Sequence, residues 1–170
     1  MRRIFLLLLT SICLTIVNAG SLSKRYTSFL TEKGILYFVR PMHMPKCEGN
    51  QTRYGLTFDI TYLDNDDDSV SFTTTVITAL PMSLDSVLIV TAQGNIKVNT
   101  DKIYSEPYKS NYLNRLRFYL KWRDLKLLYG LVIPYVIVYG DDLRFSFSRK
   151  EWMSEREIIN RIIKIIELNK

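Results

Sequence analysis

The chain of 170 residues has one histidine and two cysteines, so several common kinds of site lack their ligands. A single histidine excludes a zinc site built from several histidines, and it leaves His43 as the only histidine for any catalytic scheme. The chain has no Cys-x-x-Cys pair, no Gly-x-Ser-x-Gly turn and no glycine-rich phosphate loop. We therefore expect no cofactor, and the sequence disfavours thiol redox, esterase and nucleotide-binding functions.

The N-terminal segment is the most apolar part of the chain and predicts an export signal. Arg2 and Arg3 precede the apolar residues 4–17, and the small residues Ala19 and Gly20 follow. This order is typical of a cleaved signal peptide. A helix of about 14 residues rises roughly 21 Å, less than the roughly 30 Å core of a membrane. We expect cleavage after Ala19 and a periplasmic or secreted domain without a transmembrane segment; a retained leader is the alternative.

Removal of this leader, residues 1–19, changes the charge on which any partner prediction depends. The whole chain has a net charge of +6 and 47% hydrophobic residues. The leader holds two arginines and no acid, so cleavage lowers the charge to +4. Cys13 leaves as well, so Cys47 is alone and no internal disulfide is expected. We expect residues 20–170 to form one domain stabilised by burial, with no nucleic acid partner.

Period-two alternation of apolar and polar residues predicts a mainly antiparallel β fold. The alternation is clearest in residues 54–62 and 70–76, which flank an acidic turn and predict a β-hairpin. Further strands are predicted at 35–39, 87–91, 96–98, 116–123, 132–139 and 143–147. We expect residues 20–33 to be a polar lead-in and residues 99–112, around Pro107, to consist of turns.

Two helices are expected in the C-terminal third of the chain. Asp124 is the predicted cap of a short helix that stops at Gly130. Ser154 and Glu157 have the spacing of a capping box, and isoleucines recur on one face of the residues that follow. This predicts an amphipathic helix over about 154–168. The expected fold class is α+β, mainly β: an antiparallel sandwich or open roll with the C-terminal amphipathic helix packed on the sheet.

A basic stripe is the strongest candidate for a binding surface. If its segment is a strand, one face presents Arg115, Arg117, Tyr119, Lys121 and Arg123. The leucine spacing of the same segment also suits a helix. Such a face attracts an anionic glycan, an anionic lipid or an acidic protein partner. A solvated face that discourages edge-to-edge pairing is the ordinary alternative.

One short segment gathers the only histidine and the only cysteine of the mature chain with two methionines. Met42, His43, Met44 and Cys47 supply thioether, imidazole and thiol ligands, which together favour Cu(I) as the metal. In an extended chain the two methionines face one way and the histidine the other, so a bend at Pro45 is needed for them to converge. The ordinary alternative is that both methionines fill the core.

Acidic residues offer a third type of site. Asp64, Asp66 and Asp68 begin like a calcium loop, but Ser69 and Thr75 stand where such a loop needs glycine and glutamate. Acids far apart in the sequence can still converge after folding and act as a glycosidase pair. We expect an exported, non-catalytic binding or accessory protein of the cell envelope. A carboxylate-based hydrolase and a weak copper-binding protein are the alternatives.

Overall fold

The computed structural model describes residues 22–48, 54–64, 68–82, 85–140 and 143–169. The predicted leader and its cleavage point lie outside the described residues, as does Asp66 of the acidic turn. Strands make up 58% of the structure and helices 23%, which confirms the α+β, mainly β expectation.

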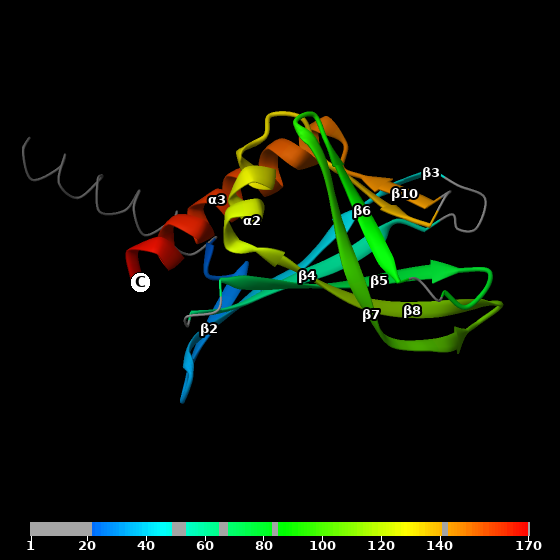
Figure 1. The fold of residues 1–170 in the computed structure, drawn as a ribbon, viewed down its shortest axis with the longest axis horizontal. Helices are drawn as coiled ribbons and strands as arrows, with labels where there is room; N and C mark the ends of the chain where they lie inside the picture. Colours follow the sequence, from blue (N-terminus) through cyan, green and yellow to red (C-terminus); the bar gives the residue numbers. More distant parts are fainter. Residues whose placement is uncertain (1–21, 49–53, 65–67, 83–84, 141–142, 170) are drawn as a thin grey trace, which may run out of the picture.

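The strands of the described chain form one antiparallel sheet that curls into a half-barrel (Figure 1). In chain order the elements are β1 (Tyr26–Thr31), β2 (Gly34–Met44), β3 (Lys46–Glu48), β4 (Leu56–Asp64), β5 (Ser69–Thr78), β6 (Ser86–Thr91), β7 (Gly94–Tyr108), β8 (Asn111–Lys121), α2 (Trp122–Gly130), β9 (Val136–Tyr139), β10 (Leu143–Ser146) and α3 (Arg149–Asn169). The strand order is β1-β2-β4-β5-β8-β7-β6-β9-β10-β3. Only Pro45 separates β2 from β3, yet the two strands lie near opposite ends of this order, so the sheet must curl back toward its own start.

The core lies on the concave face of this curl. On β4, β5 and β8 the buried apolar side chains occupy even positions, as the period of two requires. Helix α3 crosses the concave face and buries Ile159, Ile162, Ile163 and Ile166 (Figure 1). The predicted packing of an amphipathic C-terminal helix on the sheet is confirmed. The odd-numbered residues of these three strands face away from α3.

Helix α3 begins at Arg149 rather than near 154, because a different capping box starts it. Ser148 and Glu151 have the same Ser-x-x-Glu spacing, and the Glu151 carboxylate accepts a hydrogen bond from the Ser148 N–H at 3.0 Å. The Glu151 N–H in turn donates to Ser148 Oγ at 3.3 Å. The added turn places Trp152 in the core, where its ring packs on Tyr129 and Tyr135.

Helix α2 also begins before the predicted cap. Its first residue is Trp122, which stacks on Tyr62 with 4.4 Å between ring centroids, so core packing decides where the helix starts. Asp124 lies in the first turn rather than at the cap. Gly130 ends the helix as predicted, but the strand that follows is shorter than expected and begins at Val136.

Two strands lie where the sequence predicted a lead-in and turns. Strand β1 is at the edge of the sheet with four of its residues exposed, so it shows no apolar alternation. Strand β7 continues through Pro107 to Tyr108. Its second half pairs only with β8, because β6 pairs with residues 94–99 alone. An edge strand tolerates the missing N–H of a proline, which explains why Pro107 does not end β7.

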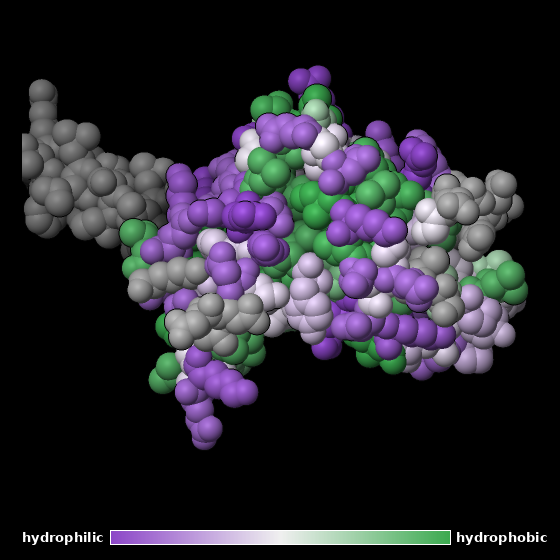
Figure 2. Space-filling view, in the orientation of Figure 1, coloured by the Kyte–Doolittle hydropathy of each residue, from purple (hydrophilic) through white to green (hydrophobic). Residues whose placement is uncertain are grey.

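A patch of apolar side chains lies between α2 and the β6–β7 hairpin, and polar side chains surround it (Figure 2). Ile96 and Val98 of β7 pack against the core on this side. Within the described ranges, no helix has both the length and the apolar character needed to cross a membrane.

Candidate functional site

The convex side of the sheet carries the predicted basic stripe. Strand β8 directs Arg115, Arg117, Tyr119 and Lys121 away from the core, because the buried residues of this strand are the even-numbered ones. Strand β5 lies on one side of β8, with Thr73 opposite Arg117. We call these five residues, together with Asp59 of β4, the arginine face. Arg123 is not part of it, since that residue lies in α2 and pairs with Asp124.

Asp59 lies beneath the guanidinium groups of this face and is only 7% exposed. Arg115 Nη2 donates to Asp59 Oδ2 at 3.2 Å. Burial raises the pKa of Asp59, because it penalises the charged carboxylate more than its partners favour it. Arg115, a hydrogen bond from Thr73 and Arg117 act in the opposite direction. Ionisation of the Asp59 carboxyl is therefore unfavourable in the folded protein. Ionisable groups with perturbed pKa values are common at functional sites.

Arg117 is the least satisfied cation of the arginine face. Its Nε is buried and has no hydrogen-bond partner among the described residues. It forms none of the ion pairs found within the described ranges, although Asp101 of β7 lies opposite it in the register. A buried donor without an acceptor costs about 1–3 kcal/mol. An anion would remove that cost if a movement of the Arg117 side chain brought Nε to the surface.

The polar surface extends across five neighbouring strands in cross-strand rows. One row runs through His43, Thr57, Thr75, Arg115 and Tyr104 on β2, β4, β5, β8 and β7. Four strand spacings make this surface about 19 Å wide. The row adds hydroxyl groups beside the arginines, and it brings His43 onto the same face as the basic stripe.

The structure places His43 of the copper hypothesis on the opposite face of the sheet from Met42 and Met44. Met42 and Met44 are 4% and 0% exposed and belong to the core. His43 points to the convex face, where its Nδ1 lies 3.3 Å from Thr57 Oγ1. Cys47 of β3 packs against the core, and burial raises the pKa of its thiol. The described residues contain no group of three or more His, Cys, Asp or Glu side chains that could hold a metal.

Asp59 and Asp101 of the convex face are too far apart for a glycosidase pair. Asp59 and Asp101 lie in one cross-strand row, on β4 and β7, with Thr73 and Arg117 between them. Three strand spacings separate them by about 14 Å. Glycosidase pairs are roughly 5 to 9.5 Å apart. This row therefore does not offer the geometry of that reaction.

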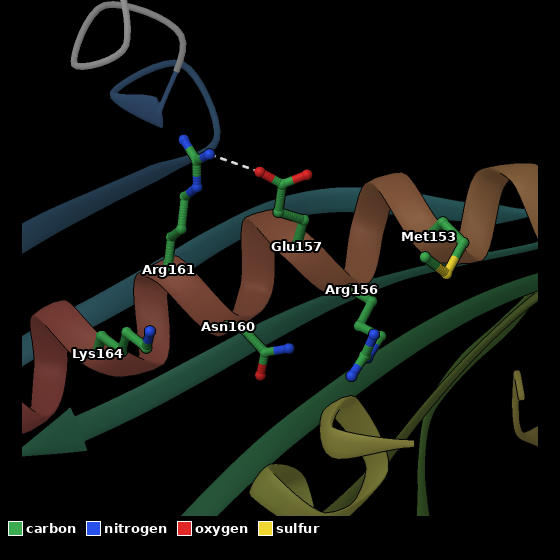
Figure 3. Close-up of a pocket in the computed structure, with 6 residues that line it drawn as sticks. All are labelled: Met153, Arg156, Glu157, Asn160, Arg161 and Lys164. Atoms are coloured by element: carbon green, nitrogen blue, oxygen red, sulfur yellow. Dashed lines mark hydrogen bonds and ion pairs between the residues drawn. The ribbon is translucent and has the colours of Figure 1, made fainter. Parts of the chain in front are cut away.

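A separate hollow lies on the exposed side of α3, with a volume of about 350 Å³. It is lined by Met153, Arg156, Glu157, Asn160, Arg161 and Lys164 (Figure 3). Arg156 and Asn160 point toward α2 and donate hydrogen bonds to the carbonyl of Tyr129 at 3.1 and 2.9 Å. Arg161 pairs with Glu157. Arg156 and Asn160 thus link α3 to α2 and satisfy the C-terminal carbonyls of α2.

Asp59 is the charged residue of the arginine face that the sequence did not suggest. Its partner Arg115 is 56 positions away, so only the strand register brings the two together. A signal was nevertheless present, because aspartate is rare in the middle of strands and Asp59 stands between Thr57 and Thr61 in a clearly alternating segment.

No protein-family model, curated protein or solved structure matches the chain. The function must therefore be inferred from the arginine face itself.

Proposed function

We propose that the chain is an exported, non-catalytic binding protein of the cell envelope whose arginine face binds an acidic glycan. The observation that carries this proposal is Arg117, a cation whose Nε is buried without a partner on an otherwise solvated sheet surface. Guanidinium groups bind carboxylates and sulfates through paired, charge-assisted hydrogen bonds. A carboxylate or sulfate of the glycan would supply the acceptor that Arg117 Nε lacks once the side chain moves to bring this nitrogen to the surface.

The neighbouring side chains suit a sugar polymer better than a small anion. Tyr119 is 46% exposed, and it offers an aromatic ring with a polar tip beside the arginines. Ser71 lies opposite Tyr119, and Thr75 lies opposite Arg115, so hydroxyl groups adjoin both residues. A polar surface about 19 Å wide accommodates several sugar units lying across the strands.

A calorimetric titration of the purified protein with polygalacturonate, chondroitin sulfate and neutral dextran tests the proposal. We expect binding to the two acidic polymers and none to dextran, with an affinity that falls as salt is added. Arg117→Gln should weaken binding about tenfold or more, because a charge-assisted hydrogen bond is worth roughly 1.5–3 kcal/mol.

Lys164→Gln is the matched control, since it removes one exposed positive charge from α3, on the other side of the sheet. It should leave the affinity within about twofold of the wild type. Equal losses in the two variants would show that net charge rather than the arginine face governs binding. Binding to phosphatidylglycerol vesicles without binding to either acidic polymer would contradict the choice of a glycan as ligand.

A further inference from the structure

The two edges of the sheet differ in how well they are protected against pairing with another strand. Strand β3 has only three residues and carries Lys46 and Glu48, both of which are exposed. Short, charged edges of this kind resist pairing. Strand β1 at the other edge has six residues, Tyr26–Thr31, and contains neither a charge nor a proline.

Two side chains of β1 are large, apolar and exposed to solvent. Phe29 is 55% exposed and Leu30 is 87% exposed. The β1–β2 hairpin projects from the body of the molecule at the lower left of Figure 1, away from β6 and β7. In Figure 2 it carries apolar side chains behind a hydrophilic tip.

The backbone of β1 shows which residues can bond to a new strand. The Arg40 N–H donates to the Arg25 carbonyl at 2.9 Å, so Arg25 and Arg40 are a hydrogen-bonded pair in the β1–β2 register. In an antiparallel pair, alternate residues point their N–H and C=O groups to the same neighbour. The odd residues of β1 therefore bond to β2. Tyr26, Ser28 and Leu30 direct theirs outward.

We propose that β1 pairs with β1 of a second copy of the chain, antiparallel, with Ser28 opposite Ser28 at a two-fold axis. In this register Tyr26 of each copy lies opposite Leu30 of the other. Tyr26, Ser28 and Leu30 have backbone groups that point away from β2. In this register each of them lies opposite another such residue, and each facing pair exchanges two backbone hydrogen bonds. The contact is isologous, so it closes at a dimer.

Charge complementarity selects this register over its neighbours. With Ser28 opposite Ser28, the turn that holds Lys24, just before β1 of one copy, lies beside the turn that holds Glu32, just after β1 of the other, at both ends of the new ladder. Neither residue forms an ion pair within the described ranges of one chain. A shift that places Phe29 opposite Phe29 moves Glu32 away from Lys24 and brings Lys33 toward Arg25, a cation that is already paired with Glu155. The opposite shift, with Thr27 opposite Thr27, leaves Glu32 beyond the end of the ladder.

Side-chain packing supports the same arrangement. Leu30 of each copy would cover the ring of Tyr26 on the concave side, and Phe29 would cover Thr27 on the convex side. Aromatic and aliphatic cross-strand pairs of this kind stabilise antiparallel ladders. The exposed side chain of Leu30 would thereby leave solvent.

Sedimentation equilibrium of the purified protein over a range of concentrations tests the dimer. We expect a reversible monomer–dimer equilibrium. Ser28→Pro should abolish it, because proline removes an N–H that points outward while the bonds between β1 and β2 remain. Glu32→Lys should raise the dimer dissociation constant about tenfold, since it turns two attractive end contacts into repulsive ones.

The charge-swapped variant Lys24→Glu/Glu32→Lys provides the decisive control. It restores both opposite-charge contacts only if residues 24 and 32 of different copies meet, so its dissociation constant should return to within about threefold of the wild type. A protein that stays monomeric at every concentration would overturn the proposal. So would a dimer that Ser28→Pro leaves intact, or one that the charge swap fails to restore.

Discussion

Replacement of Asp59 by asparagine should both stabilise the fold and strengthen anion binding. The carboxylate is buried beneath Arg115 and Arg117, and its pKa is raised because burial outweighs the attraction of the two arginines. A raised pKa means that the folded chain binds a proton more tightly than the unfolded chain does. Stability at this site is therefore highest at acidic pH and falls as the pH rises from the ordinary aspartate range through the raised pKa.

An asparagine has nearly the same shape and still accepts a hydrogen bond from Thr73, but it carries no charge to desolvate. Asp59→Asn should thus raise the unfolding temperature at pH 7 and remove this part of the pH dependence. For binding, we take an anion about 6 Å from the lost charge and an effective dielectric constant of about 40 to 80. The repulsion removed is then roughly 0.7–1.4 kcal/mol, or about a threefold to tenfold gain in affinity.

Asp101→Asn separates the two effects. Asp101 also lies beside Arg117 in the register but is exposed, so its replacement changes the charge of the surface without relieving burial. Thermal unfolding at pH 4 and pH 7, followed by tryptophan fluorescence, and the glycan titration together measure both quantities. We expect both variants to bind more tightly and only Asp59→Asn to gain stability at pH 7. An Asp59→Asn protein less stable than wild type at pH 7 would refute the reasoning, because the ion pair with Arg115 would then outweigh burial.

Two further substitutions test the packing that supports the arginine face. Asn114 is fully buried; its Oδ1 accepts from the Met82 N–H at 2.8 Å and its Nδ2 donates to Thr78 Oγ1 at 2.7 Å. Asn114→Ala should therefore lower the free energy of unfolding in urea by about 3 kcal/mol, and a loss below about 1 kcal/mol would contradict this role. In Gly55→Ala the new Cβ would lie 2.3 Å from the Met44 carbonyl oxygen as the backbone stands, so we expect a loss of about 2–3 kcal/mol. Gly130→Ala, where no atom lies within 4 Å of the new Cβ, should stay within about 0.5 kcal/mol of wild type.

The strands and helices that the sequence predicted are those that bury one face in the core and expose the other. The hairpin of β4 and β5 alternates because its even residues meet the core, and the isoleucines of α3 recur for the same reason. Strand β1 and the second half of β7 bury little and lie at edges, so no alternation marks them. Their existence depends on pairing with a neighbour, which local composition does not encode.

The candidate site was likewise predictable where alternation marks one face of a strand, and not where it depends on strand pairing. Alternation along residues 115–121 indicates that Arg115, Arg117, Tyr119 and Lys121 share a face. Arg123 was wrongly assigned to that face, because the packing of Trp122 begins a helix just before it. The positions of Asp59 and His43 on the same surface follow from the register of four strands. Register is a long-range property that depends on the whole core.

The division of one strand at Pro45 has a consequence for how the chain folds. Strand β2 pairs with β4 soon after both are synthesised, but β3 pairs with β10, whose residues 143–146 come nearly at the end of the chain. The segment of β2 and β3 therefore completes its strand pairing only after β10 has been synthesised. Contacts between residues so far apart in sequence form slowly. We expect closure of the half-barrel to be a late step in folding, completed only when β10 and the helix that follows it are available.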